Sequence, residues 1–177
     1  GAGAAGVKAG PCENINIQDN TVYHAHGGFV IGSEFSGGMK NIVVRNNTFQ
    51  GTDAGLRFKS AVKRGGKSEN IYIDHIYMTD ITGDAITFET TYFDNHVGAK
   101  QQAAPVKQEF LPDFQDIHIS NVYVRGCKNG IVAHGAEGMI HDITIKDCNI
   151  FYNKNAKDID AACKITLENV NFSTFAK

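Results

Sequence analysis

The chain has 177 residues, the size of one domain, and its charge is nearly balanced, with 17 Lys and Arg against 19 Asp and Glu. This balance excludes a generally basic nucleic-acid-binding protein and a strongly charged disordered chain. The apolar residues are mainly β-branched, with 18 Ile and 12 Val against 3 Leu and 3 Met. An all-β fold is therefore expected and a helical bundle is disfavoured.

The first residues carry no pattern of regular structure. Residues 1–6 contain only Gly and Ala, and they lack the Met, basic start and apolar run of a signal peptide. We expect a loop here, in a chain that begins partway through a longer protein. No stretch approaches the 18 or so consecutive apolar residues of a transmembrane helix, so no membrane partner is expected.

Two short sequence patterns then recur along the chain. The first is Ile-x-Ile or a close variant between polar residues, with steps of 27, 29, 46, 26 and 22 residues; its copies begin at Ile15, Ile42, Ile71, Ile117, Ile143 and Ile165. The second starts with glycine, with steps of 27, 28 and 47 residues; its copies begin at Gly28, Gly55, Gly83 and Gly130. Both alternate apolar and polar residues, which is typical of short strands.

Strands that repeat at this long period predict coils stacked into a right-handed parallel β-helix, with Ile and Val columns inside. The whole of 1–177 is expected to form coils of this single domain. A β-sandwich, with strands spaced by about 8–12 residues, is disfavoured. The 46-residue step is about 19 residues too long, which predicts a long loop at about 90–112 on the functional face.

A cluster of cations begins within the second copy of the glycine pattern, the copy that starts at Gly55. Five cations and no acidic residue stand between positions 57 and 67: Arg57, Lys59, Lys63, Arg64 and Lys67. If Leu56 and Phe58 point inward, Arg57 and Lys59 project outward together, roughly 6.6 Å apart. Such a pair can hold a carboxylate. An equally weighted interpretation is a surface ladder, in which Lys59 pairs with Glu89 on the next coil.

Candidate acids, bases and metal ligands give a weaker signal. His26 aligns with Asp53 one coil further on, close to Arg57, although a loop histidine is usually a solvated side chain; His24 and His26 form no recognisable metal site. The carboxylates near this face form no convincing acid and base pair; they are Glu34, Asp53, Asp84, Glu89 and Asp94. The remaining five histidines look scattered. None of the four cysteines forms a Cys-x-x-Cys pair, and no cofactor is expected.

Several motifs together resemble the polygalacturonases, glycoside hydrolase family 28, and most closely bacterial exo-acting members. They follow in the family's order over nearly the whole chain: Ala25-His26-Gly27, Gly51-Thr52-Asp53-Ala54-Gly55, Arg57-Phe58-Lys59, Arg64-Gly65-Gly66, Gly83-Asp84-Ala85-Ile86 and Tyr92. Ala25 replaces the first glycine of the family's Gly-His-Gly motif, and the Arg-x-Lys motif is intact.

The resemblance implies a parallel β-helix that hydrolyses α-1,4-galacturonosyl bonds in pectin with inversion. Arg57 and Lys59 would bind a galacturonate carboxylate next to the bond that is cut. His26 would support the catalytic carboxylates or the substrate, and Tyr92 would match the family's cleft tyrosine. Periplasmic or extracellular action is expected from the family. The pectic oligo- or polysaccharide and the N-terminal part of the same enzyme are the expected partners.

One departure from the family is important. The family's catalytic aspartates lie in an Asn-x-Asp motif and an Asp-Asp pair, and neither occurs in these 177 residues. We therefore expect the chain alone to be an inactive C-terminal part that carries the clamp. A rhamnogalacturonan or xylogalacturonan hydrolase and a non-catalytic carbohydrate-binding β-helix remain alternatives. A calcium-dependent pectate lyase is disfavoured, since no acidic calcium cluster is visible.

Overall fold

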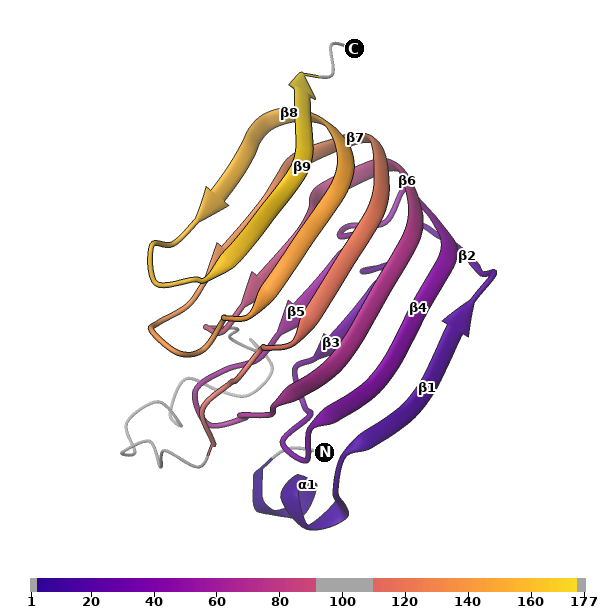
Figure 1. Cartoon of the computed structure of the whole chain (residues 1–177). Helices are drawn as coiled ribbons and strands as arrows, with labels where there is room; N and C mark the ends of the chain where they lie inside the picture. The colour runs from indigo at the N-terminus through magenta and orange to yellow at the C-terminus, as the bar shows by residue number, and fades with distance from the viewer. Residues whose placement is uncertain (1–2, 92–109, 175–177) are drawn as a thin grey trace.

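The computed structural model describes residues 3–91 and 110–174, and its strands stack as the parallel coils of a β-helix (Figure 1). All pairs between the named strands are parallel, and neighbours in the sheet follow the order β1-β4-β6-β7-β8-β9, with β3 and β5 in a shorter row that joins β6. The elements are α1 (Gly3–Ala9), β1 (Cys12–Gln18), β2 (Thr21–Tyr23), β3 (Phe29–Gly32), β4 (Met39–Gln50), β5 (Leu56–Lys59), β6 (Ser68–Glu89), β7 (Ile117–His134), β8 (Ile143–Ile159) and β9 (Ile165–Thr174).

The register of the stack confirms the first repeat residue by residue. The six isoleucines that begin its copies pair with one another in succession: Ile15, Ile42, Ile71, Ile117, Ile143 and Ile165. Each points into the core, where apolar side chains of successive coils pack on one another. Figure 1 shows the consequence, since the strands follow one another across the stack in chain order.

The second repeat has a different register from the one predicted. Phe29 pairs with Leu56, Leu56 with Ile86, and Ile86 with Ile131, which gives steps of 27, 30 and 45 residues. The glycine alignment was therefore wrong by two residues around Gly83. The inward apolar residues keep the register because they fill the core, and the irregularity between Ile81 and Asp84 absorbs the difference.

An aromatic cluster fills the core beneath the second row of strands. The ring of Phe58 is fully buried and stacks on Phe88 at 4.5 Å between centroids and 7° between planes. Phe29 and Phe114 meet Phe58 edge to face at 6.3 and 6.1 Å. Both arrangements are favourable for aromatic rings, so this cluster supports strand β5 from inside.

Several asparagines lie at the corners of the coils. Asn14, Asn41 and Asn70 have φ values of 59°, 55° and 55°, in the left-handed region that Asn tolerates better than most residues. Their side chains form a ladder, in which Asn41 donates to Asn14 at 3.0 Å and Asn70 donates to Asn41 at 2.9 Å. Each corner therefore bends the backbone and also binds the corner of the next coil.

The expectation of a loop at residues 1–6 was wrong for the described part, which begins the helix α1. Alanine favours a helix most strongly, and the backbone N–H of Gly3 donates to Ser36 Oγ at 2.6 Å. Gly10, at φ 83°, ends the helix with a hydrogen bond from its N–H to the carbonyl of Val7. In the described ranges no helix is long and apolar enough to cross a membrane.

The predicted loop at about 90–112 lies largely outside the described residues, as do Tyr92 and Asp94. Its described ends are attached to the coils. Thr90 is buried and its N–H donates to the carbonyl of His134, and the carbonyl of Phe110 accepts a hydrogen bond from the N–H of Lys63. The long sequence step therefore leaves and rejoins the stack beside the second row of strands.

Candidate functional site

Strand β5 presents two cations on one face, as the alternation of its sequence predicts. Leu56 and Phe58 are fully buried, whereas Arg57 and Lys59 lie on the outward side. Their neighbours on the preceding coil are Val30 and Gly32, respectively. Two strand rises separate the Cα atoms of the two cations by roughly 6.6 Å, which places a guanidinium fork and an ammonium group side by side.

The carboxylate of Glu89 on the next coil completes this face. Glu89 is in register with Lys59, as expected, and its carboxylate also reaches diagonally to Arg57, with Oε2 3.6 Å from Arg57 Nη2. The distance exceeds that of a normal hydrogen bond, so this is an electrostatic contact between half-buried side chains. The predicted register of Lys59 and Glu89 is thus confirmed, and Glu89 also contacts Arg57.

Gly32 makes the close approach at the end of β5 possible. Its φ of 104° is unfavourable for residues with a side chain, and a Cβ here would collide with the backbone carbonyl oxygen of Lys59. The position next to Lys59 on the preceding coil is therefore Gly32, which has no side chain.

The other cations of the cluster are placed elsewhere. Arg64 lies after β5, where its Nη1 donates to Ser33 Oγ at 2.6 Å and lies 3.4 Å from a carboxylate oxygen of Glu34. Lys67 lies 3.5 Å from Glu69 at the start of β6. The sequence cluster therefore divides into the outward pair on β5 and a loop that joins two coils.

His26 lies in the turn before β3 and pairs across coils, as its alignment predicted. Its Nδ1 is 2.7 Å from Asp53 Oδ2, and the hydroxyl of Thr82 donates to Asp53 Oδ1 at 3.2 Å. The hydrogen bond from His26 is the main cause that lowers the pKa of Asp53; the Thr82 hydrogen bond and the charge of Arg57 act in the same direction against the effect of burial. His24 is separate from this group and occupies a corner at φ 47°.

The remaining candidate acids within the described residues have partners of their own. Asp84 accepts a hydrogen bond from Asn129 at 2.8 Å, and Glu34 faces Arg64. The described residues therefore supply a cationic pair and an aspartate–histidine pair on neighbouring turns.

Two features of this face escaped the sequence interpretation. Thr82 lies on the coil after Asp53, at a step of 29 residues that matches the first repeat and could have identified it. His134 looked isolated in the sequence but is in register with Glu89 on the same outward row as Lys59. Burial lowers the pKa of His134, but the hydrogen bonds and charges of Asp160 and Asp158 outweigh it, and the pKa is raised.

The cysteines show no sign of chemical activation. All four are free; burial raises the pKa of Cys127 to about 12 and that of Cys148 to about 11, so both stay protonated near neutral pH. Within residues 3–91 and 110–174, no group of three or more His, Cys, Asp or Glu side chains is placed to hold a metal ion.

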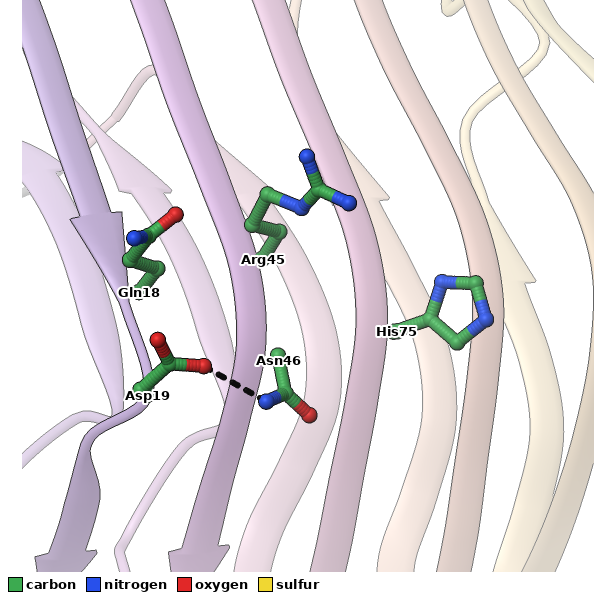
Figure 2. Close-up of a pocket in the computed structure, with 5 residues that line it drawn as sticks. All are labelled: Gln18, Asp19, Arg45, Asn46 and His75. Carbon is green, nitrogen blue, oxygen red and sulfur yellow. Dashed lines mark hydrogen bonds between the residues drawn. The ribbon is translucent and has the colours of Figure 1, made fainter.

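A polar depression lies on the outward side of β1, β4 and β6, away from β5 (Figure 2). Its lining residues are Gln18, Asp19, Arg45, Asn46 and His75. Asn46 donates to Asp19 at 2.6 Å, one more link in a ladder of corner residues. None of the residues that the sequence selected for function lines this depression.

Comparisons with known proteins agree with the parallel β-helix fold. Residues 4–167 match the family described as glycosyl hydrolases family 28. A polygalacturonase from Ralstonia solanacearum is 32% identical over 132 residues, which are 72% of this chain and 22% of that protein. An exo-poly-alpha-D-galacturonosidase from Dickeya chrysanthemi is 30% identical over 125 residues, which are 71% of this chain and 20% of that protein.

A solved structure is similar over almost the whole chain. The crystal structure of a hyperthermoactive exopolygalacturonase from Thermotoga maritima superposes with a TM-score of 0.83 at 32% identity, covering 98% of this chain and 37% of that one. The chain therefore spans only about a fifth of the length of the two curated relatives above.

Proposed function

The chain belongs to glycosyl hydrolase family 28, and we propose that it carries the substrate-carboxylate clamp of a pectin-degrading hydrolase. The proposed reaction is inverting, exo-acting hydrolysis of α-1,4-galacturonosyl bonds. The names of the similar proteins support this substrate class. Because pectin is a cell-wall polymer, the proposed site of action is extracellular or periplasmic.

The observation that carries the proposal is the outward pair on β5. Every unesterified galacturonate residue has one carboxylate, and Arg57 and Lys59 offer it a planar fork and a point charge from one rigid strand. The buried ring of Phe58 between them fixes the strand against the core. A carboxylate held here would orient the sugar beside the bond that is cut.

The remaining roles follow from the position of each group. His26 and Asp53 lie in the turns before β3 and β5, where the charge of Arg57 already acts on Asp53. In the proposal, His26 supports the catalytic groups and Tyr92 contributes to the cleft. Inversion needs one carboxyl to protonate the leaving oxygen and one to activate water. These 177 residues contain no Asn-x-Asp motif and no Asp-Asp pair, so we assign both carboxyls to coils outside them.

The test compares charged and neutral ligands on this chain. Arg57→Ala and Lys59→Ala should each weaken binding of a galacturonate trisaccharide about 10- to 150-fold, the value of one charge-assisted hydrogen bond. Neither change should affect a trisaccharide whose carboxylates have been reduced to alcohols. Arg45→Ala is the matched control, because Arg45 lies outward on β4 in the polar depression.

Equal affinity of the wild type and both variants for the charged trisaccharide would refute the clamp. Catalysis is tested separately. The isolated chain should release no galacturonic acid, and joining it to family coils that contain the aspartates should restore release. Release by the isolated chain would show that the acid and base are assigned wrongly. If the joined protein released products from rhamnogalacturonan or xylogalacturonan but not from galacturonan, the proposed substrate would be wrong.

A further inference from the structure

The pair formed by His26 and Asp53 differs from the other histidine–aspartate contacts of the described chain. His134 and His141 each contact aspartates through both ring nitrogens. His75 and His118 contact aspartates one and two residues away. His26 instead contacts an aspartate on the next coil through Nδ1, and its side chain is 98% exposed.

The backbone holds Asp53 firmly on both sides. The N–H of Asp53 donates to the carbonyl of Ala25 at 2.9 Å, next to His26. The N–H of Thr82 donates to the carbonyl of Thr52 at 3.0 Å, and the Thr82 hydroxyl donates to Asp53 Oδ1. Three successive turns are therefore stacked in register, and one carboxylate oxygen is left to face the imidazole.

The protonation pattern follows from the acceptor. An ionised carboxylate can only accept hydrogen bonds, so Nδ1 of His26 carries the hydrogen in the 2.7 Å contact. In a neutral imidazole, the partner of one nitrogen decides the role of the other, and Nε2 is then an acceptor. Because the ring is otherwise exposed, Nε2 lies on the side away from Asp53 and is accessible from solvent.

We propose that Asp53 is a positioning residue that fixes the tautomer and orientation of His26, so that Nε2 faces the reacting groups. This inference rests on the proposed function, since the orientation of His26 matters only if this face binds the reacting sugar. The charge of Arg57 on β5 acts on Asp53, and Arg57 itself pairs with Glu89 on β6. The lowered pKa of Asp53 agrees with a carboxylate that stays ionised in this environment.

Asp53→Asn tests the proposal because the asparagine side chain keeps the shape of aspartate but has an amide NH₂ group that donates hydrogen bonds. With the Asn oxygen accepting from Thr82, its amide group faces His26 Nδ1, which must then accept, and the hydrogen moves to Nε2. The readout is the ¹⁵N chemical shifts of the His26 imidazole in the full chain, which are assigned by their loss in His26→Ala. They should report the Nδ1–H tautomer in the wild type and a shift toward the Nε2–H tautomer in Asp53→Asn. Asp74→Asn is the matched control; it changes another exposed histidine contact, that of His75.

The kinetic readout uses the chain joined to the coils that contain the catalytic aspartates. Asp53→Asn should lower kcat about tenfold or more while KM changes less than about twofold, and Asp74→Asn should change neither. An unchanged tautomer, or a changed tautomer with unchanged kcat, would overturn the positioning role while the clamp stands. A wild-type enzyme that neither binds nor cleaves galacturonate would overturn the proposed function and this inference together, whatever the ¹⁵N shifts show.

Discussion

The aromatic cluster under β5 gives a prediction with a definite magnitude. In Phe58→Ala, a fully buried ring is removed together with its stack on Phe88 and its edge contacts with Phe29 and Phe114. Truncation of a buried Phe costs about 3–5 kcal/mol, and each aromatic pair adds about 0.5–1.5 kcal/mol beyond burial. We therefore expect a loss near the upper end, about 5 kcal/mol.

Thermal unfolding followed by circular dichroism measures this loss. For a chain of this size, about 2–4 °C of Tm correspond to 1 kcal/mol, so Phe58→Ala should lower Tm by about 10–20 °C. Tyr77→Ala is the matched control: its ring stacks on Tyr123 at 5.6 Å and 2°, but it is 39% exposed. It should cost about 1 kcal/mol.

The comparison also decides whether the core supports the clamp. Phe58 lies between Arg57 and Lys59, so Phe58→Leu, which keeps most of the apolar volume, should preserve galacturonate binding better than Phe58→Ala. If Phe58→Ala destabilises the chain no more than Tyr77→Ala, the stacked rings do not hold β5 in place and the reasoning is wrong.

Two further predictions concern the scaffold. Burial lowers the pKa of His141, but the contacts with Asp142 and Asp113 outweigh burial, and the pKa is raised. The protonated ring therefore stabilises the fold fully below the ordinary histidine pKa of about 6.5, and this stabilisation is lost as pH rises through the raised pKa. The wild type should therefore exceed His141→Gln in unfolding free energy by on the order of 1 kcal/mol at pH 5.5, and urea titrations that show the same gap at pH 9 would contradict this. Gly28→Ala would place a Cβ inside the Phe49 ring, so it should lower the urea midpoint by the equivalent of about 1–3 kcal/mol; an unchanged midpoint would argue against the close packing.

The parts of the fold that depend on repetition could be predicted from the sequence. Ile42 and Ile71 pair as expected because side chains that stack in a common core must recur at the same place in every coil. The alignment on Gly83 failed because a glycine at a coil end is not fixed by the core, and the irregular backbone after Ile81 adds residues without moving the inward side chains. The helix α1 was missed because its first turn is held by a hydrogen bond to Ser36, a residue distant in sequence.

The candidate site was predictable to the level of faces and rows. Alternation placed Arg57 and Lys59 outward, and coil spacing placed His26 against Asp53. Side-chain reach is not encoded in spacing, so Glu89 was assigned to the cation in register although Arg57 lies diagonally within 3.6 Å. Side-chain reach also explains why Asp158 and Asp160 were missed, since both lie on the next coil and approach the two ring nitrogens of His134.

The parallel ladder between β6 and β7 links Ile71 to Ile117 across 46 residues, yet its pairs match one for one on both sides of a single irregularity. Distance along the gene and distance along the solenoid axis are thus uncoupled in this coil. Changes of chain length between Thr91 and Phe110 can accumulate during evolution while the buried Thr90 and Phe114 and the rows of outward side chains keep their places. Under the proposed function, a change of substrate preference could therefore arise in this one segment, with no change to the strand that carries Arg57 and Lys59.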